Sequence, residues 1–456
     1  MTVSIGFWNI NGLGKDKYED PDFRKIIQNY DILCLTETWR EDGKNESNSR
    51  PPQGYREKRH NRKQKNKKAK RNSGGISVIY KSFLHDFIKV VNEKDENILW
   101  LKIDKKGISS KQDLLLGAVY ISPQDSTIHK TERATNTFEV LSTQIEAFSD
   151  SDAILLGGDF NARLGNLQDF VRIGELPNDI REDTDEDTED LDDDLASRDR
   201  ISQDKNSNAY GNDLRDLCIS TNLCILNGRT IGDLRGQYTY IGHRGCSTVD
   251  YALASREFRK HFLKSLTIEQ LNIFSDHRPI TTELRTNLRK REEQSNPELL
   301  QNLQARRSTP KYDEIYLEIL NSDLMIGKLD ELKTNMVSKM KTKGNIYEDL
   351  NTLEKLLLES MNVTVSVDRK EKVPKSNQKK TKGKAQWYNR ECVLLKRKLN
   401  YLCKRVSEMP QNAELRRSFY QARKQYRNLT KSLKNDFEKR NIDKIECSAI
   451  YENSDI

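Results

Sequence analysis

Residues 153–162 read AILLGGDFNA, a short apolar run that ends in two glycines, an acid and an amide. Four consecutive apolar residues followed by glycine predict a buried strand over Ala153–Leu156 that stops at a turn. Asp159 and Asn161 would follow that strand, at a point where a sheet can aim several side chains at one place. The stretch therefore indicates a sheet-based domain with its functional residues at the strand ends.

The same pattern recurs over the first 285 residues, where short apolar runs alternate with amphipathic stretches. The predicted strands are Val3–Trp8, Ile32–Thr36, Ile76–Tyr80, Ile98–Ile103, Leu114–Tyr120, Ala153–Leu156, Leu223–Leu226, Thr248–Leu253 and Ile280–Leu284. The predicted helices are Asp22–Asn29, Asn136–Phe148 and Asn212–Thr221. Many strands with interspersed helices predict a two-sheet α/β sandwich rather than a barrel.

Composition narrows the class of protein. The chain has 456 residues, which is enough for a large domain and a second region. No run approaches the roughly 18 to 20 apolar residues of a membrane span, so a membrane partner is not expected. The start, MTVSIGFWNI, lacks the basic segment of a secretory signal, and the seven cysteines show no CxxC spacing. An intracellular protein with reduced thiols is the simplest interpretation.

Charge is distributed unevenly along the chain. Residues 369–440 hold 23 Lys and Arg against 6 Asp and Glu, or +17, so the rest carries −9 of the net +8. A Lys/Ser/Gln-rich linker opens this region, and a basic helical pattern with interleaved aromatics follows Trp387. DNA or RNA could bind there, with Arg397 and Arg423 as candidate contacts. A solvated helical surface, with its aromatics packed on a partner helix, is an equally good interpretation.

Two charged insertions interrupt the first domain. Lys58–Arg71 holds nine Lys and Arg with no acid, and Glu182–Asp194 holds ten acids in thirteen residues. Neither has enough apolar surface to order itself, so both are expected to be exposed, mobile loops. Lys63 and Lys67 are candidate phosphate contacts, and the basic run could act as a nuclear import signal. It could also be a simple solvated insertion.

Polar side chains gather at the ends of the predicted strands. They are Asn9, Asn11, Glu37, Tyr120, Asp159, Asn161, Asp250, Asp276 and His277. Each alone is ordinary, since a carboxylate after a strand is commonly a turn or N-cap residue and a lone His is commonly structural. Together they offer oxygen ligands for a hard cation, a base for water and donors for a phosphate. That set indicates phosphodiester hydrolysis.

The order of these motifs resembles the endonuclease/exonuclease/phosphatase superfamily, which includes DNase I-like enzymes and apurinic endonucleases. The matching motifs over residues 3–285 are W-N-x-N-G, T-E-T, Y-x-x-P, G-D-F-N, V-D-Y and S-D-H-R-P. The resemblance implies a four-layer α/β sandwich. It also implies that Glu37 ligates Mg²⁺, or Mn²⁺ as a substitute, with Asn11 nearby where apurinic endonucleases usually have Asp. Asp276 would support the metal, and Asn9 would help to place metal and water.

The resemblance also implies roles at the phosphate. Asp159 polarises the attacking water or serves the leaving oxygen, and Asn161 orients the phosphate. Tyr120 donates a hydrogen bond to a phosphate oxygen. Asp250 holds His277, which contacts the phosphate or acts as base. A carboxylate–imidazole pair of this kind fixes both the tautomer and the pKa of the ring.

The sequence indicates the class of substrate less directly than it indicates the fold. Inositol polyphosphate 5-phosphatases usually carry Trp near the central and late motifs, where this chain has Leu155-Leu156-Gly157 and Ser247-Thr248-Val249. The run from Ala385 to Cys392 with the basic helix after it resembles the segment that links endonuclease to reverse transcriptase in LINE-type non-LTR retrotransposons. A target-nicking DNA endonuclease that leaves 3′-OH and 5′-phosphate ends is therefore expected. An apurinic repair endonuclease, an inositol-phosphate phosphatase and a non-catalytic nucleic-acid-binding protein are the alternatives.

The chain is expected to divide into three parts. Residues 1–286 form the endonuclease/exonuclease/phosphatase domain, 287–368 a helical connector and 369–456 a basic, helical and mobile linker-like region. The sequence contains no Tyr-x-Asp-Asp motif, so reverse transcriptase activity is not expected. A truncated element and a domesticated host protein both fit this organisation. The basic runs favour a nuclear location.

Overall fold

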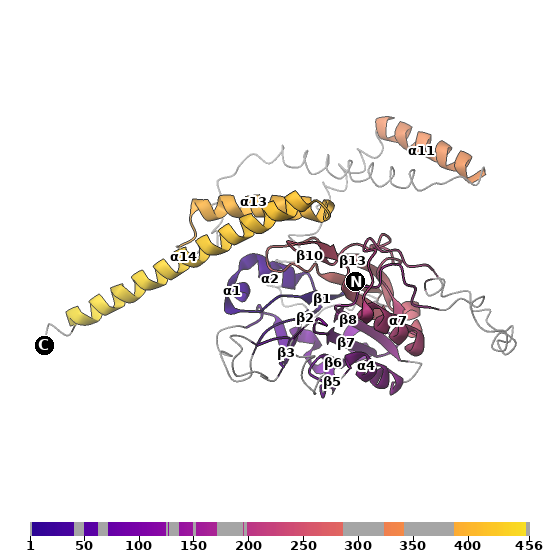
Figure 1. The fold of residues 1–456 in the computed structure, drawn as a ribbon, viewed down its shortest axis with the longest axis horizontal. Helices are drawn as coiled ribbons and strands as arrows, with labels where there is room; N and C mark the ends of the chain where they lie inside the picture. The colour runs from indigo at the N-terminus through magenta and orange to yellow at the C-terminus, as the bar shows by residue number, and fades with distance from the viewer. Residues whose placement is uncertain are drawn as a thin grey trace. The chain divides into compact units, whose positions relative to one another are not determined.

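The computed structural model describes residues 2–40, 50–62, 72–124, 126, 136–148, 152–170, 195, 198–285, 323–341 and 387–452. The chain falls into two compact units, coloured along the sequence in Figure 1. One unit joins Met1–Arg289 to Ala385–Ile456, and the other is Lys290–Lys384. In the second unit only helix α11, Asp323–Lys341, is described. Among the described helices, none has the length and apolar character needed to cross a bilayer.

The first sheet of the larger unit has six strands in the order β13-β14-β1-β2-β4-β3. Their bounds are β1 Thr2–Asn9, β2 Ile32–Thr36, β3 Tyr55–His60, β4 Ile76–Lys81, β13 Leu263–Ile268 and β14 Ile280–Arg285. Strands β1 and β2 run parallel, and helices α1 (Lys15–Glu19) and α2 (Pro21–Gln28) lie between them in the chain. Helix α2 begins where the Asp20 side chain accepts a hydrogen bond from the backbone of Asp22.

The second sheet has six strands in the order β5-β6-β7-β8-β12-β9. Their bounds are β5 Ile88–Asn92, β6 Ile98–Ile103, β7 Leu114–Tyr120, β8 Ala153–Asp159, β9 Cys224–Ile225 and β12 Asp250–Ala254. Strands β7 and β8 run parallel, connected through helix α4, Thr137–Glu146. A separate two-stranded ribbon consists of β10, Tyr240–Ile241, and β11, Cys246–Ser247.

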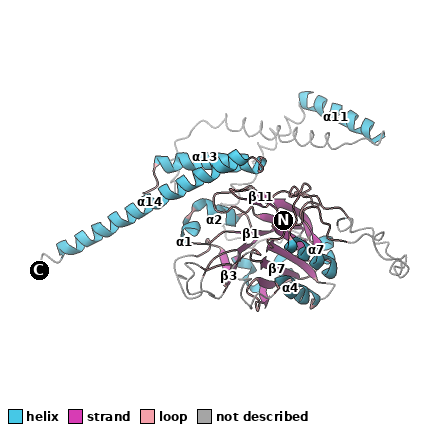
Figure 2. Ribbon diagram, in the orientation of Figure 1, coloured by secondary structure: helices cyan, strands magenta, loops and turns pink. Residues whose placement is uncertain are grey.

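Successive side chains along each strand point to opposite faces of its sheet, so that each sheet packs on the other sheet on one face and on helices on its outer face. Figure 2 shows the strands in magenta flanked by helices in cyan. In β7, Leu114 and Leu116 point into the core between the sheets, whereas Leu115 points outward. The outer face of the second sheet packs against α4 and α7, Ala209–Thr221. The outer face of the first sheet packs against α1 and α2. The predicted α/β sandwich is confirmed.

The parallel pairs bring strand ends from both sheets to one edge of the sandwich. Asn9 at the end of β1 is paired with Thr36 at the end of β2. Tyr120 at the end of β7 is paired with Asp159 at the end of β8, and Asp250 at the start of β12 pairs with Asp159 from the other side. Residues far apart in the sequence therefore meet where these strands stop.

All nine predicted strands exist, although β8 continues beyond Leu156 to Asp159 and β12 begins at Asp250. The three predicted helices also exist, with α7 starting earlier, at Ala209. Strands β3, β5 and β13, each at the edge of its sheet, were not predicted, and neither were the two-residue strands β10 and β11. Edge strands with one solvated face carry polar residues, as YREKRH in β3 shows, so their hydrophobic signal is weak.

One prediction about the basic insertion is wrong. Its first residues, Lys58–His60, form the end of β3, paired with β4 rather than lying in a loop. Arg62 is only 4% exposed and packs over the Tyr120 ring, with 5.4 Å from its Cζ to the ring centroid. Pairing with β4 orders this polar segment, which composition alone could not show. Lys63–Arg71, with Lys63 and Lys67, and the acidic run Glu182–Asp194 lie outside the described residues.

The predicted basic helical stretch after Trp387 is an antiparallel pair of helices, α13 (Arg390–Glu408) and α14 (Ala413–Glu452). Phe419 and Tyr426 of α14 are buried in the same apolar cluster as Trp8 and Phe23 of the sandwich. These two aromatics thus serve packing, whereas Tyr401 is exposed. The helical pair belongs to the same compact unit as the sandwich.

Candidate active site

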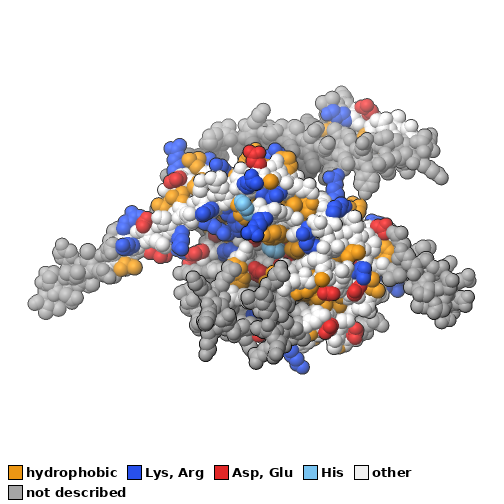
Figure 3. Space-filling model, in the orientation of Figure 1, with side chains coloured by type: hydrophobic (Ala, Val, Ile, Leu, Met, Phe, Trp, Pro, Cys, Tyr) orange, Lys and Arg blue, Asp and Glu red, His pale blue; other side chains and the backbone are white. Residues whose placement is uncertain are grey.

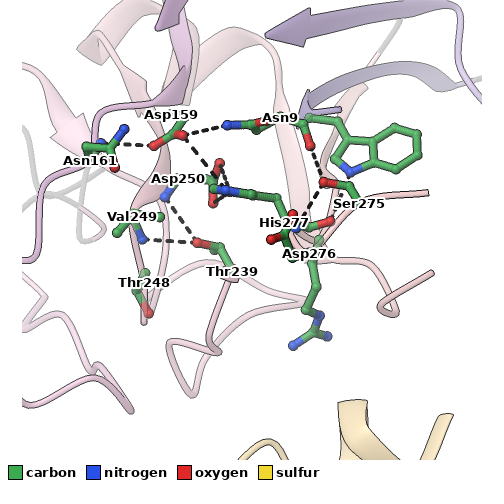
Figure 4. Close-up of polar contacts among 12 residues, drawn as sticks. Asn9, Asp159, Asn161, Thr239, Thr248, Val249, Asp250, Ser275, Asp276 and His277 are labelled. Atoms are coloured by element: carbon green, nitrogen blue, oxygen red, sulfur yellow. Dashed lines mark hydrogen bonds and ion pairs between the residues drawn. The ribbon is translucent and has the colours of Figure 1, made fainter. Parts of the chain in front are cut away.

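Asp159, the last residue of β8, lies at the centre of the converging strand ends and is 1% exposed. Its Oδ1 accepts a hydrogen bond from the backbone N–H of Asn161 at 2.9 Å, and its Oδ2 accepts one from Asn9 Nδ2 at 2.7 Å (Figure 4). Asn9 belongs to the other sheet. The bond between them therefore joins the two sheets and holds the carboxylate in one orientation.

A buried imidazole–carboxylate pair faces Asp159. The Nδ1 atom of His277 lies 3.0 and 2.9 Å from the two carboxylate oxygens of Asp250. This contact makes Nδ1 a donor and leaves Nε2 on the side of Asp159, 4.0 Å from its Oδ2. Ring, carboxylate and second carboxylate converge as Figure 4 shows. Such a group can hold and transfer a proton.

The remaining predicted residues form two hydrogen-bonded pairs beside this centre. Tyr120 donates its hydroxyl to Glu37 Oε1 at 2.5 Å, and Asn11 Nδ2 donates to Asp276 Oδ1 at 2.7 Å. The backbone N–H of Gly12 donates to the Glu37 carbonyl at 2.7 Å, which ties the segment after β1 to the segment after β2. Glu37, Asn11 and Asp276 are partly exposed, unlike the buried centre.

The backbone turns sharply where these side chains leave their strands. Asn11, Glu37 and Asn161 have φ angles of 51°, 54° and 49°. Among the described residues only six other than glycine have a positive φ, so half of that set lies in this site. A side chain in the left-handed region costs conformational energy and persists where the surroundings enforce it. The surrounding structure, rather than the conformational preference of these residues, thus holds the backbone at the strand ends in this conformation.

Burial and mutual repulsion shift the acid–base properties of the centre. Burial, with Asp250 as the next contribution, raises the pKa of Asp159 well above its ordinary carboxylate value. Burial alone would lower the pKa of His277, but the adjacent Asp250 outweighs it and raises that pKa to about 10. The ring is therefore protonated at neutral pH, and Asp159 is a stronger base than an exposed carboxylate.

The chemistry of the donor set fits a divalent cation. Among the described residues, Asp159, Asp250 and His277 each place a carboxylate oxygen or ring nitrogen within 4.8 Å of the others, and the two carboxylates offer oxygen ligands. Glu37 and Asp276 add two further carboxylates. Burial, the largest influence, would raise the pKa of Asp276, but His277 and the Asn11 amide are among the groups that outweigh it, so that this pKa is lowered. Four carboxylates around one imidazolium leave an excess of negative charge and oxygen donors, which suits a hard cation such as Mg²⁺ or Mn²⁺.

A second layer of polar residues holds these groups, and sequence reasoning assigned it no role. Thr239 Oγ1 accepts from the backbone N–H of Asp250 at 3.0 Å. Ser275 Oγ donates to the Asn9 carbonyl at 2.6 Å, and Trp8 Nε1 donates to the His277 carbonyl at 2.9 Å. Ser275 and Trp8 lie inside the motifs quoted above, so the motifs were a usable signal for them. Thr239 lies in no motif.

The predicted nucleic-acid contacts lie in different surroundings. Arg397 is on the exposed face of α13. Arg423 of α14 is 5% exposed and donates its Nε to the Ile273 carbonyl at 2.9 Å, four residues before His277. Arg423 thus bonds the helical pair to the segment that carries the His277 imidazole.

Two mixed sheets with helices on both outer faces, and a His–Asp pair between carboxylates at the strand ends, define a DNase I-like phosphoester hydrolase fold. The chain belongs to the Endonuclease/Exonuclease/phosphatase family, whose sequence model matches residues 6–277. A comparison with curated protein sequences finds no match.

Several solved structures are similar in fold at low sequence identity. The endonuclease domain of TRAS1, a telomere-specific non-LTR retrotransposon, is 13% identical, with 63% of this chain and 100% of that chain covered and a TM-score of 0.39. The AP endonuclease LMAP from Leishmania major is 14% identical, with coverage of 62% and 88% and a TM-score of 0.44. The catalytic domain of Xenopus laevis APE2 is 14% identical, with coverage of 63% and 94% and a TM-score of 0.43.

Proposed function

We propose that the protein is a divalent-metal-dependent DNA endonuclease that hydrolyses phosphodiester bonds. The observation that carries the proposal is the buried group of Asp159, His277 and Asp250, with ligand atoms within 4.8 Å of one another. Glu37, Asn11 and Asp276 would hold a cation on the partly exposed side of this group. The cation supplies positive charge that stabilises the charge developing on the phosphate.

The side chains divide the remaining work. Ionised Asp159 accepts the proton of the attacking water, and its raised pKa makes it a stronger base than an exposed carboxylate. Asn9 and the Asn161 backbone keep that carboxylate aimed by their two hydrogen bonds. Protonated His277 donates from Nε2 to a phosphate oxygen while Asp250 holds Nδ1. Each of these roles uses an atom whose position the other partners already restrain.

DNA as the substrate is supported by charge. Residues 369–440 carry +17, and their two described helices belong to the same compact unit as the site. Lys and Arg that contact phosphates release counterions, so binding should weaken steeply as salt rises. With the retrotransposon-like segment around Trp387, these helices favour target-site nicking over repair at abasic sites. RNA is a second partner that the same basic surface could bind, and we propose a nuclear location.

The test is nicking of supercoiled plasmid by the full chain in Mg²⁺ or EDTA, with Asp159→Ala and His277→Ala as variants. Wild type should nick only with the metal, and each variant should lose at least about 100-fold in rate. Asp86→Ala and His261→Ala, on exposed surfaces, are the matched controls and should nick as wild type does. A folded wild-type protein that leaves the plasmid intact would contradict the proposal.

The finer assignments need their own measurements. An apurinic repair enzyme would cut a duplex with one abasic site far faster than the intact duplex, whereas a target-nicking enzyme would cut both. Extension of the nick by a DNA polymerase would establish the 3′-OH end. Release of phosphate from a soluble inositol phosphate, without nicking, would instead identify a phosphatase.

A further inference from the structure

A groove of about 520 Å³ opens directly beside the candidate active site. Its lining includes Arg163, Tyr240, His243, Arg244, Asp276 and Tyr420. Five of these come from the sandwich and its β10–β11 ribbon, but Tyr420 comes from α14, 144 residues beyond Asp276, the last of the five (420 − 276). The groove therefore exists in this form only because the helical pair packs on the sandwich.

Specific polar contacts hold α14 at the groove. The Tyr420 hydroxyl donates to the Ile241 carbonyl at 2.6 Å, at the end of β10. Gln411, in the turn before α14, donates to the Tyr238 hydroxyl at 2.7 Å. Lys434 pairs with Asp16 at 2.6 Å and lies further along the same helix. These contacts, added to the shared apolar cluster, hold the Tyr420 ring in place at the groove.

The groove is continuous with the site through two residues. Tyr240 pairs with His277 across an isolated bridge, and their ring centroids are 4.9 Å apart. Asp276, the neighbour of His277 in the chain, also lines the groove. A chain whose scissile phosphate lay at His277 would therefore place an adjoining nucleotide in the groove.

The chemistry of the walls fits a nucleotide. Tyr420 and Tyr240 supply aromatic faces, and the Tyr420 ring meets His243 edge-on with 6.0 Å between centroids. Stacking on such rings accepts any base. The guanidinium of Arg163 is already bound to both oxygens of Asp204, at 2.9 and 2.7 Å, so Arg244, exposed on the β10–β11 turn, is the cation best placed for a phosphate. Figure 3 shows several Lys and Arg side chains (blue) close together near the middle of the face that it draws.

We propose that this groove is a nucleotide-binding subsite for the DNA strand next to the scissile phosphate, with Tyr420 of α14 as a stacking residue and Arg244 as a phosphate contact. The inference rests on the proposed endonuclease function and extends it. The helical pair is then part of the substrate site rather than a separate binding module.

The test measures binding of the full chain to a short fluorescein-labelled DNA duplex by anisotropy in EDTA, where no cleavage is expected. Tyr420→Ala should weaken binding about tenfold through the lost stacking. Tyr420→Phe, which keeps the ring but loses the bond to the Ile241 carbonyl, should weaken binding less than Tyr420→Ala does. Arg244→Ala should weaken binding and lower the slope of log affinity against log salt by about one. Tyr401→Ala, exposed on α13, and Arg56→Ala, exposed on β3, are matched controls.

A second readout separates stacking from a general packing effect. Duplexes lacking the base on one side of the preferred nick should bind wild type more weakly, and Tyr420→Ala should no longer distinguish them from intact duplex. Tyr420→Leu, which keeps an apolar side chain without the aromatic face, should behave as Tyr420→Ala while melting as wild type does. That variant keeps the test decisive if Tyr420→Ala proves unstable.

The outcomes are distinguishable from those of the nicking assay. If wild type binds DNA but does not nick it, the nuclease proposal fails while the subsite stands or falls on the variants. If Tyr420→Ala and Tyr420→Leu are folded and bind within twofold of wild type, the subsite is overturned even when nicking is normal. Absence of DNA binding by wild type overturns it as well.

Discussion

At the scale of single residues, the His277–Asp250 pair sets how the site responds to pH. The carboxylate lies within 3.0 Å of Nδ1, and it raises the pKa of the ring to about 10 against the opposing effect of burial. The protonated ring is the proposed donor to the phosphate. Activity should therefore fall as pH rises through the alkaline range in which the ring loses its proton.

Asp250→Asn removes the negative charge that keeps the proton on His277. We expect the alkaline limb of the kcat/KM profile to move to lower pH, because burial lowers the pKa of the ring and the variant removes the charge that most opposes it. Activity at neutral pH should drop by about 100-fold as the protonated fraction falls. Nicking rates measured over a pH series test this expectation. An alkaline limb at the same pH in wild type and variant would contradict it. Asp216→Asn, at an exposed position on α7, is the matched control.

At the scale of elements, the end of β8 depends on a glycine that no other residue can replace. Gly158 has a φ of +145°, and a Cβ added there would lie 2.0 Å from the carbonyl oxygen of Val119 in β7. Strand β8 could not keep its register with β7 around such a contact, and Asp159 is the next residue. The close approach of the β7 and β8 backbones thus positions the Asp159 carboxylate in the site.

Gly158→Ala should lower the free energy of unfolding by about 3 kcal/mol, because both the backbone angle and the contact with Val119 are unfavourable for a side chain. Denaturant unfolding followed by circular dichroism measures this. Gly14→Ala is the control, since a Cβ there meets nothing within 4 Å and the φ of Gly14 is −84°. A Gly158→Ala protein as stable as wild type would show that β7 and β8 can separate freely.

The pair α13–α14 should be part of the same cooperative unit as the sandwich. Phe419 is fully buried in the cluster that also contains Trp8 and Phe23. Phe419→Ala should therefore cost about 3 to 5 kcal/mol, and it should lower the single melting transition of the unit. Phe83→Ala, where the ring is 62% exposed, should change little. A separate early transition in the Phe419→Ala protein would mean that the helices unfold independently.

At the scale of the whole molecule, an excess of buried and half-buried carboxylates destabilises the metal-free fold. Like charges repel, and Asp159 is buried beside Asp250 and influenced by Glu37. A cation that binds only the folded state would offset this repulsion and raise the melting temperature by mass action. Binding of the proposed metal would therefore be measurable as a rise in melting temperature as well as in activity.

Saturating Mg²⁺ should stabilise wild type by about 2.7 kcal/mol at a hundred times the dissociation constant. Glu37→Gln should abolish most of that gain without a large loss of stability in EDTA, because Glu37 is only partly buried. Differential scanning calorimetry in Mg²⁺ and in EDTA checks both expectations. Equal melting temperatures in the two solutions for wild type would contradict metal binding at this site, and Asp86→Asn is the control for loss of one exposed charge.

The local pattern of apolar and polar residues was sufficient to predict the central strands and most of the candidate site residues. Apolar runs such as 153–156 predicted the buried central strands, because strands covered on both faces are continuously apolar. Polar residues placed after those runs, including Asp159 and His277, were identified from the sequence as candidate site residues, and the structure brings them together. Polar edge strands such as β3 lacked that signal, since pairing with β4 rather than apolar content orders them.

The sequence by itself determined the class of fold, the central strands and the set of polar residues at their ends. Tertiary structure alone decided which of these side chains touch: Asn9 and Asp159 are 150 residues apart in the chain, and Asn11 and Asp276 are 265 apart. It also decided that Thr239 supports Asp250 and that Tyr420 lines the groove at the site. Periodicity encodes local conformation and burial, whereas contacts between distant segments depend on how the sheets and helices pack as one body.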